Sequence, residues 1–143
     1  MSLPPRLAEI VEDFQLAEGR EKLELLLHFS EQLPPLPDFL LGQSDQMDQV
    51  HECMTPIFVY AERDGDNLVY YFDAPPESPT VRGFAELMRQ GLSGNPPETI
   101  LAVPADFYLA MGLQSVLTGQ RLNGIAAILA HMKRLATQQL TAS

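Results

Sequence analysis

Apolar residues in the first quarter of the chain recur at helical spacing. The first predicted helix has an apolar face with the i, i+3, i+4, i+7 pattern, made of Leu7, Ile10, Val11 and Phe14. A second amphipathic stretch covers residues 20–32, and its expected inner stripe is Leu23, Leu26 and Leu27. The proline-rich run at residues 33–37 ends this second helix, because proline lacks an amide donor and restrains the residue before it.

The middle of the chain has the pattern of a β-hairpin. Two runs rich in β-branched and aromatic residues, 57–61 and 68–72, flank the polar sequence Asp-Gly-Asp-Asn at residues 64–67. A third strand around residues 49–52 is indicated only weakly, although a hairpin alone would be marginally stable. The polar segment 38–50 is interpreted as an extended loop.

The second half of the chain returns to helical spacing. Ser78 is the expected N-cap of a helix with Pro79 in its first turn, and the apolar face of that helix comprises Val81, Phe84, Ala85 and Met88. Asn95 and Glu98 resemble a capping box that begins another helix.

Two further helices are predicted near the C-terminus. A short one covers residues 106–111 and ends at Gly112. Thr118 caps a longer closing helix, whose apolar positions in register are Leu122, Ile125, Leu129, Met132 and Ala136. The whole pattern predicts an α+β fold, in which a small antiparallel sheet of about three strands is covered by helices. We expect residues 1–143 to form a single domain, because no linker or repeat divides them.

Charge and composition exclude several classes of partner. The chain has 143 residues with 9 basic and 19 acidic side chains, so its formal net charge is −10. This charge disfavours binding to nucleic acid or to an anionic membrane. The apolar runs are too short to span a bilayer, and residues 1–6 lack the features of a secretory signal. We therefore expect a cytoplasmic protein.

Cys53 is the only cysteine of the chain, which excludes an intramolecular disulfide and a CxxC redox site. It follows the predicted loop and directly precedes an apolar run. A lone cysteine is commonly a small buried hydrophobic residue. At the junction of a loop and a strand, however, its thiolate would also be placed to attack a sulfur atom and accept it.

The charges near Cys53 in the sequence are negative. Asp45, Asp48 and Glu52 precede it, and Arg63 is the nearest basic residue other than histidine. Negative neighbours disfavour the thiolate, so we expect the pKa of Cys53 not to fall below its ordinary value. Our hypothesis is that this cysteine stays unreactive until a docked partner supplies positive charge.

The histidines provide weaker candidates. His51 is a candidate local base or metal ligand, although a loop histidine without a chemical role is the simpler interpretation. A zinc site built from Asp48, His51 and Cys53 lacks a second Cys/His cluster to complete the tetrahedron. His28 and His131 lie on predicted helices and have no catalytic spacing.

Arg121 and Gly124 are unusual for the first turns of a helix. An arginine there opposes the helix dipole, so its guanidinium is a candidate partner for a carboxylate or an anionic thiolate. A glycine inside a helix costs about 1 kcal/mol relative to alanine, and close approach of another segment would explain Gly124.

These residues together resemble the SufE family of sulfur-acceptor proteins in Suf iron–sulfur cluster assembly. The family pattern Val-x-x-Cys-x-Ser-x-Val-Trp reads Val-His-Glu-Cys-Met-Thr-Pro-Ile-Phe at residues 50–58, and Leu-[ST]-x-x-Arg-x-x-Gly-[LM] matches residues 117–125. Gly83, residues 93–100 and the Leu-Pro-Pro-Leu-Pro run also align with family segments. The resemblance covers about residues 7–136.

The resemblance implies a specific activity and set of partners. A SufS-type cysteine desulfurase, which uses pyridoxal phosphate, would hold a persulfide that Cys53 attacks. The protein would then stimulate that enzyme and carry the sulfur to an iron–sulfur scaffold, as a partner and activator rather than a stand-alone enzyme. The implied fold is SufE/IscU-like, the chain itself would bind no cofactor or metal, and Arg121 would position the cysteine loop or the docked partner.

One segment departs from the family pattern. Many members have Gly-Asp-Ser-Asp-Ala between the last strand and the next helix, whereas residues 72–79 read Phe-Asp-Ala-Pro-Pro-Glu-Ser-Pro. Glu77 falls at the position of the second family aspartate and is the candidate family acid.

Two other functions remain as alternatives. The first is a non-catalytic acidic protein-interaction module in which Cys53 is a buried structural cysteine. The second is a thiol-dependent hydrolase, for which the sequence offers no base other than His51. Pairing of two copies of the chain into a homodimer is compatible with each of these functions.

Overall fold

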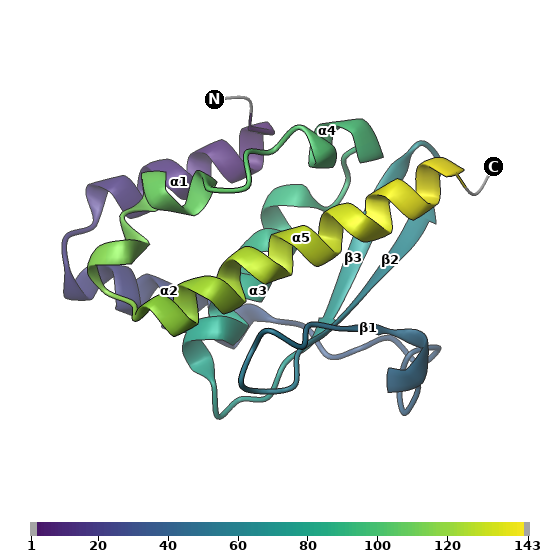
Figure 1. The fold of residues 1–143 in the computed structure, drawn as a ribbon, viewed down its shortest axis with the longest axis horizontal. Coiled ribbons are helices and arrows are strands. Elements are labelled where there is room, and N and C mark those ends of the chain that lie inside the picture. The colour runs from purple at the N-terminus through teal and green to yellow at the C-terminus, as the bar shows by residue number, and fades with distance from the viewer. Residues whose placement is uncertain (1–2, 142–143) are drawn as a thin grey trace.

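Five α-helices, three short 3₁₀ helices and a three-stranded sheet make up residues 3–141, the part of the chain described by a computed structural model (Figure 1). The α-helices are α1 (Pro5–Leu16), α2 (Arg20–Gln32), α3 (Pro79–Leu92), α4 (Pro97–Leu101) and α5 (Gly119–Thr141). The 3₁₀ helices are η1 (Ser44–Gln46), η2 (Phe107–Met111) and η3 (Leu113–Ser115). The strands are β1 (Asp48–Gln49), β2 (Phe58–Asp64) and β3 (Asn67–Asp73).

The sheet is antiparallel with the order β1-β2-β3. The predicted hairpin is confirmed: β2 and β3 pair from Phe58↔Asp73 to Asp64↔Asn67, and Gly65 adopts the positive φ of 64° that a two-residue turn favours. β1 is shorter than the third strand predicted around residues 49–52 and pairs only with the first residues of β2. The expected α+β class is therefore the observed one.

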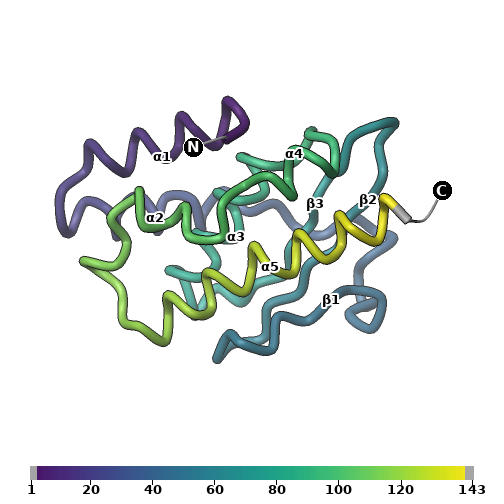
Figure 2. Tube along the Cα trace, turned by 45° about the horizontal axis from the view of Figure 1, so that its top comes forward, coloured from purple at the N-terminus to yellow at the C-terminus, as the bar shows by residue number. Residues whose placement is uncertain are grey.

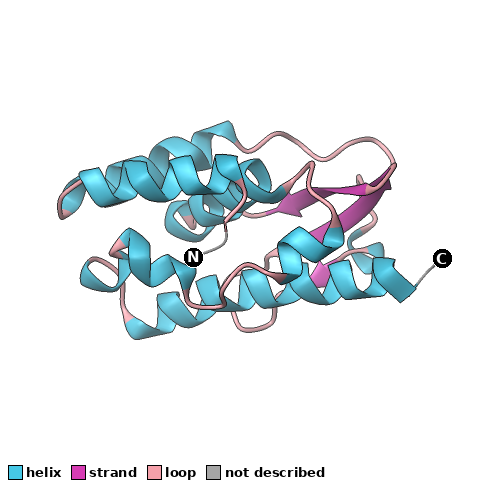
Figure 3. Cartoon of the chain, turned by 90° about the horizontal axis from the view of Figure 1, so that it is seen from above, coloured by secondary structure: helices cyan, strands magenta, loops and turns pink. Residues whose placement is uncertain are grey.

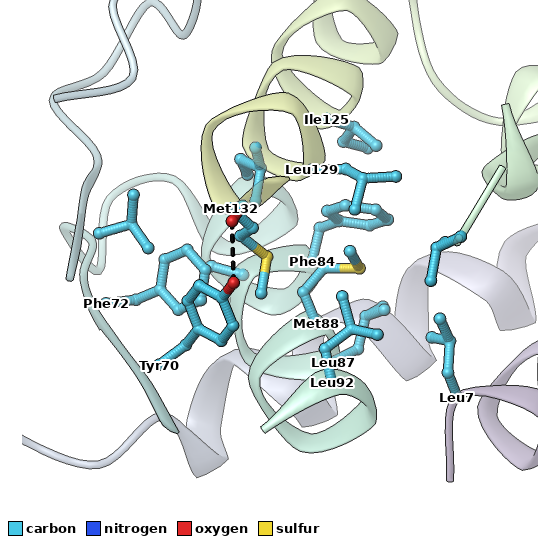
Figure 4. Packing of buried hydrophobic residues seen from close by; sticks show 14 of the residues in the cluster. Leu7, Tyr70, Phe72, Phe84, Leu87, Met88, Leu92, Ile125, Leu129 and Met132 are labelled. Atoms are coloured by element: carbon cyan, nitrogen blue, oxygen red, sulfur yellow. Dashed lines mark hydrogen bonds between the residues drawn. The ribbon is translucent and has the colours of Figure 1, made fainter. Parts of the chain in front are cut away.

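α5 lies along one face of the hairpin (Figures 1 and 3). The hairpin residues buried on the inner face are Val59, Ala61, Leu68, Tyr70 and Phe72. The Tyr70 hydroxyl donates a hydrogen bond of 2.8 Å to the carbonyl oxygen of Met132, and Figure 4 shows these two residues in contact. This bond fixes α5 on the sheet from within the core, where an unpaired hydroxyl would be costly.

α3 is the central helix of the core, since it packs against α1, α2, β3 and α5. Figure 4 shows Phe84 and Met88 of α3 within the same cluster as Ile125 and Leu129 of α5. After α4, the chain runs back through η2 and η3 beside α1 before α5 begins (Figure 2). The beginnings of α3 and α5 are thereby held at the same end of the molecule.

Gly83 sets the distance between α2 and α3. A Cβ atom at this position would lie 2.0 Å from the backbone oxygen of Leu26 and 2.8 Å from its carbonyl carbon. Real Cβ atoms do not approach backbone this closely, so a larger residue would force the two helices apart.

The predicted buried face of α2 is partly wrong. Leu26 is buried, but Leu23 is 37% and Leu27 is 50% exposed, whereas Lys22 and Phe29 are buried. The buried face of the helix is therefore rotated relative to the prediction, and on that face the Lys22 ammonium donates to the carbonyl of Phe14 in the last turn of α1. A lysine that satisfies a helix C-terminus in this way has no signature in the apolar spacing.

The sequence predicts where α3 and α5 begin, but it predicts the hydrogen bonds that cap the helices less well. Thr118 caps α5 as expected, since its Oγ1 accepts from the Arg121 N–H at 3.2 Å. Ser78 precedes α3 as expected, but its side chain makes no capping bond. The capping box is wrong: Pro96 is the N-cap residue of α4, and Asn95 instead forms a bridge with Leu68.

The remaining expectations differ in detail. The helix predicted over residues 106–111 is the 3₁₀ helix η2, and it ends as expected at Gly112, which has a φ of 74°. The loop predicted over residues 38–50 contains η1 and β1. Among the helices of residues 3–141, none has the length and apolar content required to cross a bilayer.

We predict that Gly83→Ala lowers the free energy of unfolding by about 1–3 kcal/mol, because the new methyl group overlaps the α2 backbone. Urea denaturation followed by circular dichroism measures this change. Gly119→Ala in α5 is the matched control, since a Cβ there meets nothing within 4 Å and should change stability by less than about 1 kcal/mol. Equal stability of the two variants would contradict the packing described for α2 and α3.

Candidate functional site

Cys53 lies in a loop between β1 and β2 that is fixed at its base. The Val50 N–H donates to the Ile57 carbonyl at 2.8 Å, and the Cys53 N–H donates to the Val50 carbonyl at 3.2 Å. Val50 and Ile57 are fully buried, whereas Met54 beyond the cysteine is 81% exposed. The loop thus has a base anchored in the core and a tip that reaches solvent.

The Cys53 side chain is half-buried against the backbone of α5. Its thiol donates a weak hydrogen bond to the Gly124 carbonyl oxygen, with 3.6 Å between Sγ and O. A Cβ atom at residue 124 would lie 3.1 Å from Sγ. The close approach predicted for Gly124 is therefore confirmed, and the segment that approaches is the cysteine loop itself.

Cys53 opens onto a pocket of about 380 Å³. The pocket is lined by the loop, by the connection from β3 into the first turn of α3, and by the first turns of α5: Cys53, Met54, Thr55, Glu77, Ser78, Pro79, Thr80, Val81, Gln120, Arg121 and Gly124. The structure therefore brings together three of the sequence candidates, Cys53, Glu77 and Arg121.

The electrostatics of this pocket favour an anion more than the sequence near Cys53 suggests. The N-terminal ends of α3 and α5 both border it, and each carries unsatisfied amide groups and the positive end of a helix dipole. Arg121 is exposed, and its Nη1 lies 3.5 Å from Oγ1 of Thr80, which links the first turn of α5 to that of α3. Among the described residues that line the pocket, Glu77 is the only acidic one.

The thiol itself is held in the neutral form. Burial raises the pKa of Cys53 to about 11, and the negative charge of Glu52 adds to the shift. This agrees with the sequence-based expectation that the pKa of Cys53 does not fall. The larger cause of the raised pKa, however, is burial under α5, which is a tertiary effect.

His51 is exposed and does not line the pocket. No group of three or more His, Cys, Asp or Glu residues within the described part of the chain is arranged to hold a metal ion. A local zinc site formed by Asp48, His51 and Cys53 thus has no support in the geometry.

His131, which has no catalytic spacing in the sequence, lies beside the cysteine loop. Its Nδ1 lies 2.5 Å from Oδ2 of Asp48, and its Nε2 lies 3.1 Å from Oε1 of Glu52. Asp48 also accepts a hydrogen bond from Arg134. His131 follows Gly124 by about two helical turns on the same face of α5, and this spacing is the signal that would have placed it beside the cysteine loop.

We predict that alkylation of Cys53 in the isolated protein is slow at pH 7 and rises roughly tenfold per pH unit towards pH 10, because only the thiolate reacts. Iodoacetamide labelling followed by intact mass spectrometry measures the rate. The urea-unfolded chain is the control and should titrate near the ordinary value of about 8.5. A pKa near 6 in the folded protein would contradict the geometry.

The same shift predicts a loss of stability in alkali. The folded state favours the protonated thiol, so the contribution of Cys53 to the free energy of unfolding is fully present below the unfolded pKa of about 8.5. It is then lost as the pH rises towards the folded pKa of about 11. A Cys53→Ser variant should lack this component of the alkaline destabilisation.

Comparisons with known proteins agree with this arrangement. A family model described as "SufE: Fe-S metabolism associated domain" matches residues 8–136. An uncharacterized SufE-like protein of Mycobacterium tuberculosis is 45% identical over 134 residues, which are 93% of this chain and 92% of that protein. A protein of Plasmodium vivax named "Cysteine desulfuration protein SufE" is 28% identical over 141 residues, which are 94% of this chain and 54% of that protein.

A solved structure has the same fold over nearly its whole length. The solution structure of a hypothetical protein from Thermus thermophilus is similar with a TM-score of 0.86 and 36% sequence identity. The match covers 98% of this chain and 99% of that one. By profile, by sequence and by fold, the chain belongs to the SufE family.

Proposed function

We propose that this protein is a cytoplasmic sulfur acceptor and carrier. It takes persulfide sulfur from a SufS-type cysteine desulfurase onto Cys53, stimulates that enzyme and passes the sulfur to an iron–sulfur cluster scaffold. The observation that carries this proposal is the position of the only cysteine, at the mouth of a pocket that also contains Arg121 and two helix N-termini. Residues 1–143 act as one SufE-like domain, in keeping with the core cluster that extends from Leu7 to Ala136.

The transfer step exchanges one sulfur–sulfur bond for another. The Cys53 thiolate attacks the outer sulfur of the persulfide on the desulfurase, and the bond from that sulfur to the enzyme cysteine breaks. The enzyme leaves as a thiolate and takes up the proton that Cys53 lost, so the products are an enzyme thiol and a Cys53 persulfide. The step needs no external oxidant, reductant or cofactor.

The resting state protects the thiol. With a pKa of about 11, Cys53 is almost wholly protonated at neutral pH and reacts slowly with small molecules in solution. Activation requires the loop to leave Gly124 or a docked partner to supply positive charge, because either change favours the thiolate. The exposed Met54 at the loop tip is available to contact that partner.

A single cysteine suits a carrier of one sulfur atom. A second thiol nearby would attack the persulfide, expel its sulfur and close a disulfide. The chain has no second cysteine, so a transferred sulfur stays on Cys53 until an external thiol accepts it.

The other pocket residues have distinct proposed roles. Arg121 steadies the anionic sulfur or positions the loop, since its guanidinium is permanently charged and lies in the same pocket. Glu77 serves as the family acid on the exposed rim, where it faces the docked partner. His51 stays a weak candidate for a local base, because it is exposed and lies outside the pocket.

We predict that Cys53→Ser leaves the fold intact but abolishes stimulation of a SufS-type desulfurase, because a hydroxyl cannot accept the persulfide sulfur. Alanine release from cysteine by the purified desulfurase measures the stimulation. Thr55→Ser in the same loop is the matched control and should keep it.

Full stimulation by Cys53→Ser would refute the sulfur-acceptor role. That result would instead favour the acidic interaction module, in which docking alone activates the partner and Cys53 is structural.

We predict that Arg121→Ala slows transfer of sulfur to Cys53 about tenfold, since one hydrogen bond to a charged group is worth about 1.5 kcal/mol. Arg121→Lys, which keeps the charge, should recover part of the rate. The rate of persulfide formation, with thermal unfolding measured in parallel, tests this. Arg20→Ala, an exposed change in α2 outside the pocket, is the control. An unchanged rate for Arg121→Ala would remove Arg121 from the site.

A further inference from the structure

His131 connects α5 to two acidic residues that precede Cys53 in the chain. On one side, its Nδ1 contacts Asp48 in β1, before the loop. On the other, its Nε2 contacts Glu52, the residue next to Cys53. The imidazole side chain is 15% exposed, so it lies between the two acids rather than in solvent.

The two contacts differ in how easily they separate. Asp48 is 18% exposed, pairs with Arg134 as well as His131, and belongs to a strand that is hydrogen-bonded to β2. Glu52 is 54% exposed and has His131 as its ion-pair partner. The contact on the Asp48 side is therefore part of the fixed base, and the contact on the Glu52 side is the one that can open.

Opening of the Glu52 contact is tied to movement of Cys53. The two residues are adjacent, and the Cys53 side chain rests on Gly124, about two turns before His131 on α5. A loop movement that takes Sγ away from Gly124 also pulls the Glu52 carboxylate away from the imidazole. Exposed ion pairs are weak, so this contact biases the loop without locking it.

The charge state of Glu52 suits this contact. Its own backbone N–H and the side chain of His131 lower the pKa of Glu52, so the group is a carboxylate and an acceptor at neutral pH. The same negative charge contributes to the raised pKa of Cys53. Glu52 thus holds the loop closed and, while the loop is closed, disfavours the Cys53 thiolate.

We propose that Glu52 and His131 form a latch that holds the Cys53 loop against α5 between sulfur transfers, with His131 as its positioning residue. The term latch refers here to the contact between these two side chains. The relevance of the latch to sulfur transfer rests on the proposed function, but its existence does not. It determines how often the loop exposes the only thiol to a partner.

A double-mutant cycle on alkylation of Cys53 tests the latch in the isolated full-length protein. Maleimide labelling at a fixed pH is measured for the wild type, His131→Ala, Glu52→Ala and the double variant. We expect His131→Ala to accelerate labelling roughly two- to fivefold in the wild-type background, the range for loss of one exposed ion pair. In the Glu52→Ala background, the same change should have almost no effect, because alanine has no side-chain atom that can contact the imidazole and the latch is already absent.

The cycle separates the latch from two simpler effects. Glu52→Ala also removes a negative charge near the thiol. That effect is present in both variants that carry the substitution, so it cancels when they are compared. General destabilisation by His131→Ala would act in both backgrounds and would make labelling depend steeply on low concentrations of urea, whereas local opening of a loop does not. His28→Ala in α2 is the matched histidine control and should label at the wild-type rate. If His131→Ala does not fold, His131→Gln replaces it.

Equal acceleration by His131→Ala in both backgrounds, or no acceleration in either, would overturn the latch. The assay contains no desulfurase, so its failure would leave the sulfur-acceptor role untouched. Conversely, a protein that shows the expected cycle but never gains sulfur on Cys53 would retain the latch and lose the proposed function.

Discussion

The close contact between the Cys53 loop and the backbone of α5 determines the properties of the site. A Cβ atom at residue 124 would lie 3.1 Å from Sγ, which is tighter than an ordinary contact, so glycine at this position lets the thiol pack closely against the helix. This packing half-buries the thiol and thereby raises the pKa of Cys53. The same contact places the cysteine beside the N-terminal ends of α3 and α5, which favour an anion once the loop opens. A protected thiol and its place beside two helix N-termini thus result from one packing arrangement.

The hydrophobic core holds that arrangement in place from a distance. Gly83 lets α2 and α3 pack with their backbones in contact, which fixes the start of α3 at the edge of the pocket. The hydrogen bond from Tyr70 to Met132 fixes α5 on the sheet, and α5 supplies both Gly124 and Arg121. The Cys53 loop is anchored at its base by buried Val50 and Ile57, whereas Met54 at its tip is exposed.

Local signals in the sequence predicted most of the elements, and the resemblance to SufE gave the family that the comparisons show. The hairpin and the start of α5 were predicted correctly, because each depends on residues close together in the sequence. These are Gly65 in the hairpin turn and Thr118 as the cap of α5. The buried face of α2 was not, since it includes Lys22, whose ammonium is satisfied by a carbonyl of another helix, and a buried lysine has no signature in the apolar spacing. The burial of Cys53 and the contact of His131 with Asp48 also escaped prediction. The latter joins residues 83 positions apart, so it forms only when α5 packs beside the cysteine loop.

The central claim is that Cys53 is a carrier of one sulfur atom, and intact mass spectrometry tests it most directly. The protein is incubated with a SufS-type cysteine desulfurase and cysteine, separated from the enzyme without reductant, and weighed. We expect a gain of one sulfur atom per chain, located on Cys53 and removed by a thiol reductant. An unchanged mass while the desulfurase turns over cysteine, or the same gain in a chain that lacks the thiol, would contradict the claim.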